Sequence, residues 1–151
     1  MSIFNAMNIS SSALTAQRLR MDVAASNIAN AQSTRATINE NGEYEPYRRK
    51  MVTFQSKNQS FRSFFNRAVN NQNANLSGVR ATRIIEDQTP FKVEYNPMHP
   101  DANEEGYVRL PNVDPLKEMV DIMSATRSYE ANVTALNATK NMLLKALEIG
   151  K

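Results

Sequence analysis

Few side chains in this sequence can do chemistry. His99 is the single imidazole among 151 residues, and cysteine is absent. A cysteine nucleophile, a disulfide, a cysteine-rich zinc site and a two-histidine metal site are therefore impossible within one subunit. No acid or nucleophile is placed to work with His99 as a general base, so we expect it to be a structural or solvent-exposed loop residue. We predict that the chain is not an enzyme and holds no cofactor.

The segment from Asp101 to Gly106 resembles the first half of a calcium-binding EF-hand loop, because alternate oxygen-bearing side chains precede a glycine. The twelfth position of such a loop would be Asn112, where a bidentate glutamate is needed. The flanking sequence favours strands or turns over the two helices of an EF-hand. We therefore predict an acidic turn and no metal site.

Charged residues are separated along the chain. Between Pro46 and Ile85 eight residues are basic and none is acidic, whereas between Glu86 and Glu105 six acidic residues stand against Lys92 alone. Phenylalanines lie among the basic residues, as in some proteins that bind single-stranded nucleic acid. The opposite charges of the two zones favour contact between them, within one subunit or between copies. With a net charge of only +3, we expect no nucleic-acid partner.

The positions of glycine and proline divide the sequence into three zones. All glycines except Gly150, and all prolines except Pro115, lie between Gly42 and Pro111. Because both residues disfavour helix interiors, the sequence predicts an α+β fold with long terminal helices and a small central β-rich domain. We predict an N-terminal helical domain at residues 1–33, a β-rich domain at 34–111 with an Asn-rich loop at 55–76, and a C-terminal helical domain at 112–151.

Local patterns predict where the elements begin and end. Asp114 followed by Pro115 is typical of a helix start, and Gly150 of a helix end. Gly42 marks a turn. Candidate strands are residues 47–54, 79–85, 91–95 and 107–110, and a short helix is expected around Phe61, Phe64, Phe65 and Val69.

Both terminal zones repeat apolar residues every seven positions, as coiled coils do. The N-terminal repeat is Met7, Leu14, Met21 and Ile28. The C-terminal repeat is Ile122, Tyr129, Leu136 and Leu143, with Met119, Val133 and Leu147 on the adjoining position. The apolar stripe is widened by Leu116, Val120, Met123 and Leu144. A second apolar set, Ile9, Leu19 and Val23, lies on nearly the opposite side of the N-terminal helix.

These repeats indicate how the helices pack. We predict that the two heptad sets pair as an antiparallel, coiled-coil-like hairpin, and that the second set of the N-terminal helix faces neighbouring subunits. Because one partner helix covers only one of the two apolar faces, we expect the terminal helices to be poorly ordered in the free monomer.

The sequence has no apolar stretch of the kind that targets or spans a membrane. No unbroken apolar region follows Met1, and no run of about 18 apolar residues occurs. A helix lying on a membrane surface needs a basic face opposite its apolar one, and the N-terminal helix has two apolar faces instead. We predict no cleaved signal peptide and no direct membrane insertion.

Three parts of the sequence resemble one protein family. Residues 13–31 resemble the N-terminal motif of bacterial flagellar rod and hook proteins. Residues 112–114, 118–120 and 127–132 resemble the paired C-terminal motif of that family, and residues 95–108 are similar to a segment of its proximal rod members.

The resemblance implies a structural subunit of the flagellar basal-body rod, located outside the cytoplasmic membrane and exported unfolded by the flagellar type III apparatus. It implies that the terminal helices form an inner tube around the export channel, and that the rod transmits torque from motor to hook. The implied partners are other copies in a helical assembly, the rod proteins FlgB, FlgF and FlgG, and the adaptor FliE. The alternative is a soluble cytoplasmic coiled-coil adaptor that binds partner helices.

Overall fold

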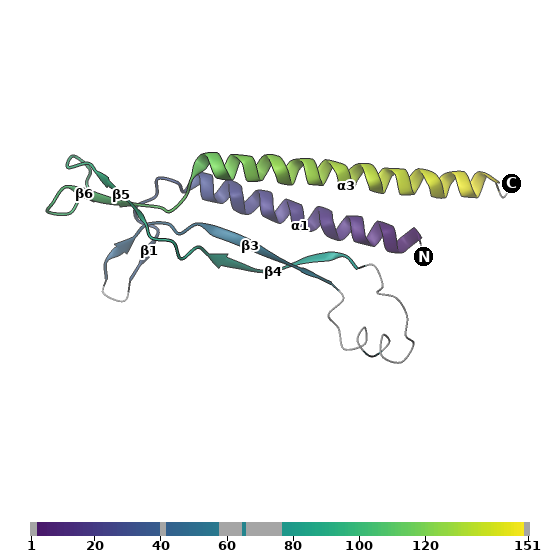
Figure 1. Ribbon diagram of the computed structural model, residues 1–151, viewed down its shortest axis with the longest axis horizontal. Helices are drawn as coiled ribbons and strands as arrows, with labels where there is room; N and C mark the ends of the chain where they lie inside the picture. The colour runs from purple at the N-terminus through teal and green to yellow at the C-terminus, as the bar shows by residue number, and fades with distance from the viewer. Residues whose placement is uncertain (1–2, 40–41, 58–64, 66–76, 150–151) are drawn as a thin grey trace. The chain divides into compact units, whose positions relative to one another are not determined.

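The computed structural model describes residues 3–39, 42–57, 65 and 77–149 (Figure 1). Its long helices are α1 (Ile3–Ala29) and α3 (Pro115–Ile149). The strands between them are β1 (Thr37–Ile38), β2 (Tyr44–Glu45), β3 (Lys50–Ser56), β4 (Val79–Glu86), β5 (Lys92–Tyr95) and β6 (Tyr107–Leu110). The predicted α+β class, with helices at both ends, is confirmed.

The predicted start of the C-terminal helix is also confirmed. The Asp114 side chain accepts a hydrogen bond from the Leu116 N–H at 3.1 Å, and the Asp114 carbonyl accepts one from the Glu118 N–H at 3.0 Å. Pro115 then occupies the first helical position, where its missing N–H costs nothing. The predicted stop at Gly150 lies outside the described residues.

The strands form three separate two-stranded sheets. β1 pairs with β2, and β5 pairs with β6, both antiparallel. β3 pairs with β4: the Lys57 N–H donates to the Gly78 carbonyl, and the Asp87 N–H donates to the Arg49 carbonyl, each at 2.8 Å. Because these bonds join opposite ends of the two strands, β3 and β4 also run antiparallel.

The strand predictions differ from the structure mainly at the shortest elements. β1 and β2 were not expected, because two residues are too few to show the alternation that marks a strand. The predicted turn at Gly42 is confirmed, with a φ of 80° there. Most of the predicted Asn-rich loop at 55–76, with the short helix expected around Phe61, lies outside the described residues; Phe65 is helical. The loop prediction was wrong at Gln55 and Ser56, which belong to β3.

The chain divides into two compact units, and the first comprises Met1–Leu19, Thr53–Arg83 and Ser124–Lys151. Within it, the hairpin β3–β4 ends against α1. The Val79 N–H donates to the Ser12 hydroxyl at 3.1 Å, and that hydroxyl donates to the Ile9 carbonyl at 2.7 Å. A Cβ atom at Gly78 would overlap the Ser12 hydroxyl, so the hairpin approaches the helix this closely because the residue is glycine.

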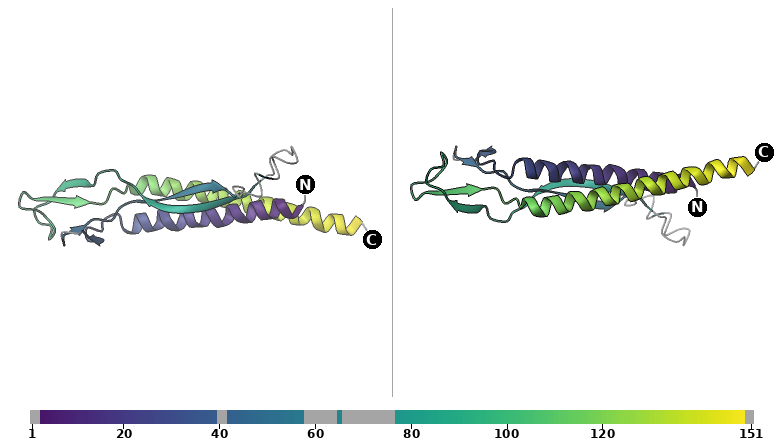
Figure 2. Two further views of the ribbon diagram at one scale, coloured as in Figure 1. Left: turned by 90° about the horizontal axis from the view of Figure 1, so that it is seen from below. Right: turned by 90° about the horizontal axis from the view of Figure 1, so that it is seen from above.

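The second unit comprises Arg20–Val52 and Ile84–Met123. The end of α1 lies beside the start of α3 here (Figure 2). Arg20 forms an ion pair with Asp121, and Asn27 bonds to Glu118, so the helices run antiparallel in this unit. The coiled-coil-like pairing of the heptad sets and the three predicted domain ranges stay predictions.

Neither of the two long helices, as far as they are described, combines the length and the apolar character needed to cross a membrane.

Candidate functional site

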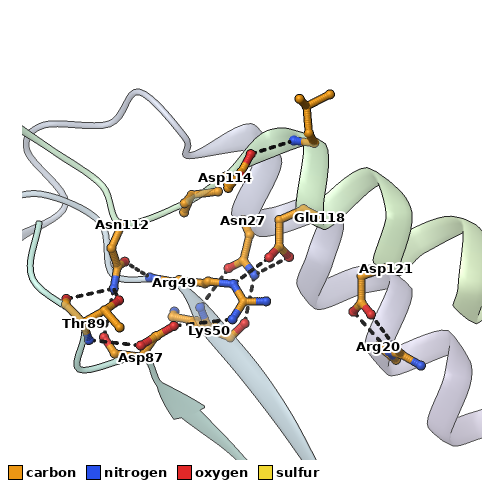
Figure 3. A network of polar contacts seen from close by, with 12 residues as sticks. Arg20, Asn27, Arg49, Lys50, Asp87, Thr89, Asn112, Asp114, Glu118 and Asp121 are labelled. Carbon is orange, nitrogen blue, oxygen red and sulfur yellow. Dashed lines mark hydrogen bonds and ion pairs between the residues drawn. The ribbon is translucent and has the colours of Figure 1, made fainter. Parts of the chain in front are cut away.

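A buried polar cluster joins α1, β3 and α3 within the second unit (Figure 3). We call Asn27, Arg49, Asn112 and Glu118 the polar junction. Asn27 and Glu118 are each only 1% exposed. A buried carboxylate needs charged or hydrogen-bonding partners. Arg49 Nε donates to Glu118 Oε1 at 2.6 Å, and Asn27 Nδ2 donates to Glu118 Oε2 at 2.9 Å, so both carboxylate oxygens have partners.

The Asn27 amide uses its full hydrogen-bonding capacity. Its Nδ2 also donates to the Lys50 carbonyl at 2.8 Å. Its Oδ1 accepts bonds from the Lys50 N–H at 2.9 Å and the Tyr47 hydroxyl at 3.0 Å. The amide thus bonds to both backbone groups of Lys50, as a neighbouring strand would, and fixes the start of β3 to α1.

Asn112 binds the backbone of Arg49, the residue just before β3. Its Oδ1 accepts a bond from the Arg49 N–H at 2.8 Å. Its Nδ2 donates to the Asp87 carbonyl at 3.0 Å and to the Thr89 hydroxyl at 2.9 Å. Two asparagines, one near the end of α1 and one just before α3, therefore bind consecutive residues where β3 begins.

The charges of the junction are stabilised by their neighbours. Burial lowers the pKa of Arg49, but its bonds to Glu118 and Asp87 outweigh that effect, so the pKa lies above its usual value. The Thr89 N–H, which donates to the Asp87 carboxylate at 3.0 Å, lowers the pKa of Asp87, and Arg49 adds to that effect. The ion pair of Arg49 with Asp87, at 3.4 Å, joins the basic zone of the sequence to its acidic zone.

Sequence analysis did not predict this cluster. Asn27, Asn112 and Glu118 all lie in the stretches that carry the family resemblance, yet their spacing does not distinguish a buried glutamate from an ordinary solvated one. The residue that could have indicated the cluster is Asn27. It is polar, yet it lies on the helix face that carries Ala16 and Ala24, which are both nearly fully buried. A polar residue on an apolar face indicates a partner group.

His99 and Asp101, which lie in the candidate catalytic and calcium-binding segments, form hydrogen bonds that stabilise the local structure. His99 Nδ1 accepts a bond from the Asp101 N–H at 3.1 Å. The Asp101 carboxylate accepts bonds from the Thr34 hydroxyl at 2.6 Å and from Arg35 Nε at 2.7 Å. The bonds from Arg35 and Thr34 lower the pKa of Asp101. Its oxygen atoms thus bond to the chain itself, and no cluster of three metal-ligating side chains occurs in the described part of the molecule.

All of the predicted interface residues except Leu147 are half-buried. Leu147 is 71% exposed. The others are half-buried, namely Met7, Ile9, Leu14, Leu19, Met21, Val23, Ile28, Ile122, Tyr129, Val133, Leu136 and Leu143. The contacts that we predicted among them stay predictions.

The second unit exposes an apolar face on α3. Leu116, Met119, Val120 and Met123 are 74%, 53%, 60% and 59% exposed, respectively. Their spacing of three, four and seven residues places them on one side of the helix, opposite the buried Glu118. We call these four residues the α3 stripe. Contiguous exposed apolar side chains of this kind mark interaction surfaces.

Two family models match the two ends of the chain. Residues 7–37 match the flagella basal body rod protein family, and residues 104–149 match the C-terminal family of flagellar basal body rod FlgEFG proteins. The chain is 60% identical to the flagellar basal-body rod protein FlgC of Bacillus subtilis over 151 residues, which is 100% of both chains. It is 42% identical to FlgC of Salmonella typhimurium, again over 100% of both chains.

A third relative matches over nearly its full length. FlgC of Borreliella burgdorferi is 41% identical over 165 residues, which cover 99% of this chain and 98% of the relative. The chain therefore belongs to the FlgC family of flagellar basal-body rod proteins, which are structural components of the basal-body rod and not enzymes, as the sequence resemblance predicted.

Proposed function

We propose that this rod protein assembles through its terminal helices into a hollow shaft, which encloses the export channel and transmits torque from the motor to the hook. The observation that carries the proposal is the α3 stripe. Because the chain belongs to a rod protein family, we propose that the apolar face is covered in the rod.

The α3 stripe is suited to a neighbouring helix. Its side chains form a row that packs into the grooves of another helix. Fully burying a large apolar side chain stabilises by about 1.5–3 kcal/mol, so covering the exposed parts of four such residues contributes roughly 4–7 kcal/mol. The proposed occupants are terminal helices of the rod proteins FlgB, FlgF and FlgG, of FliE, or of another copy of this chain.

The heptad residues complete the proposed interface. We propose that the sets containing Leu14 and Leu136 meet within a subunit. The half-buried state of these side chains supports their use in packing. Long helices packed side by side make a stiff element, which torque transmission requires. Before assembly, the chain would pass through the flagellar type III export apparatus.

The proposal is tested by placing a charge on the α3 stripe. Val120→Asp and Met123→Asp, each as the only copy in the cell, should abolish swimming, because burying an unpaired carboxylate in a helix interface is costly. Lys140→Asp is the control, since Lys140 is an exposed polar residue of the same helix that lies off the side bearing the stripe. The purified variants should keep their circular dichroism, which separates loss of assembly from loss of folding. Normal swimming by both stripe variants would contradict the proposal.

A further inference from the structure

A groove of about 600 Å³ lies between the hairpins β1–β2 and β5–β6 in the second unit. Its apolar lining includes Tyr44, Val93 and Tyr107, which are 59%, 64% and 44% exposed. Each of these side chains stands on a two-stranded sheet, so the groove walls come from regular elements. Exposed aromatic side chains of this kind are typical of interaction surfaces.

The groove combines this apolar lining with negative charge. Arg35 and Asp101, which also line it, form an ion pair and neutralise each other. The remaining charged lining residues are Glu43, Glu105 and Arg109. Neither glutamate has an ion-pair partner in the part of the chain that the structure describes. The groove therefore favours an occupant that is basic and has apolar stems.

The first unit carries a surface with the complementary chemistry. Lys57, Arg80 and Arg83 are exposed on the hairpin β3–β4 and just beyond it, and we call them the basic hairpin end. No acidic residue occurs anywhere from Pro46 to Ile85. Within the described ranges, none of the three forms an ion pair. Their positive charges thus have no acidic neighbour along this stretch of chain.

We propose that the basic hairpin end of one copy of this chain docks in the groove of a second copy. The carboxylates of Glu43 and Glu105 would receive the cationic groups, and Tyr44 and Tyr107 would contact the apolar stems of the lysine and arginine side chains. The contact is heterologous, since it joins two different surfaces. Repetition of such a contact generates a ring or an open helical array, so it would fix the register between copies independently of the α3 stripe.

Charge reversal on the full chain tests the proposal. At low salt, Arg80→Glu with Arg83→Glu should weaken self-association about tenfold in sedimentation velocity, as expected for losing two exposed ion pairs. Adding Glu43→Lys and Glu105→Lys to the same chain should restore association, because the charges are complementary again. Lys140→Glu, at an exposed position on α3 away from the side of the stripe, is the control and should change nothing. An unchanged first variant, or no recovery in the second, would overturn the proposal.

Disulfide trapping supplies a second readout, since the chain has no cysteine of its own. Ala102→Cys lies in the groove lining, and Ser56→Cys lies beside Lys57 at an exposed position. Oxidising a mixture of the two single variants should give a disulfide-linked heterodimer, whereas Ala102→Cys mixed with Lys140→Cys should give little. Equal yields would count against the groove contact. All of these changes leave the α3 stripe intact. Equal disulfide yields would therefore leave the proposed rod assembly unaffected.

Discussion

Hydrogen bonding by individual amides explains part of the unusual composition of this chain. It contains 18 asparagines, and two of them, Asn27 and Asn112, bind the backbone of the consecutive residues Lys50 and Arg49, where β3 begins. Asn27 also donates to the buried carboxylate of Glu118. A shift of α1 against α3 by one turn would leave that carboxylate without its partner, so the polar junction specifies one alignment of the two helices.

Breaking the polar junction should destabilise the fold strongly. Arg49→Met should lower the free energy of unfolding by about 3 kcal/mol, because it leaves the Glu118 carboxylate buried without its cation. The measurement is equilibrium unfolding in urea.

A surface ion pair provides the control for that measurement. Lys145→Met removes the partner of Glu148 at a position where the lysine side chain is 78% exposed. The change should alter the free energy of unfolding by no more than about 0.5 kcal/mol, as for other exposed pairs. Equal effects of Arg49→Met and Lys145→Met would show that the buried pair has no special role.

The helices and strands that could be predicted are those whose boundaries depend on neighbouring residues in the sequence. Asp114 and Pro115 identify the start of α3 because capping depends on two adjacent residues. β6 (Tyr107–Leu110) matches its predicted range, since its turn and its alternation are both local. The three separate sheets and the polar junction depend on contacts between distant residues, such as Arg49 with Glu118. Periodicity in one stretch of sequence carries no information on such contacts.

The close approach of the hairpin β3–β4 to α1 gives the prediction at this scale. Gly78→Ala should destabilise the protein by about 1–3 kcal/mol, as overpacking does, because the new Cβ meets the Ser12 hydroxyl and lies 3.1 Å from the Ser12 Cβ. Thermal unfolding measures the effect.

A double-variant cycle then identifies the cause of that destabilisation. Ser12→Ala removes the hydroxyl, so the combination of Ser12→Ala and Gly78→Ala should be less destabilised than the sum of the single variants. Gly42→Ala is a useful comparison, because a Cβ there meets nothing within 4 Å and only the positive φ is strained. Strict additivity at Ser12 and Gly78 would rule out the steric explanation.

At the scale of the whole molecule, large apolar side chains are more often exposed than buried in the described residues. Tyr47, Val108 and Val113 are buried, whereas Leu116, Met142 and many others are more than half exposed. Neighbouring subunits can bury such apolar surface in a rod, whereas in a solitary protein it would stay in contact with water. The missing catalytic residues and the exposed apolar faces thus agree with a structural role.

Assembly of the rod should cover the α3 stripe. Val120→Cys introduces a single reactive thiol at a residue that is 60% exposed in the free chain. The thiol should react readily with a maleimide in the purified subunit, and at least about tenfold more slowly in detergent-extracted basal bodies. Its reactivity should return when the basal bodies are dissociated. Equal labelling of the free and the assembled protein would show that the α3 stripe stays exposed in the rod.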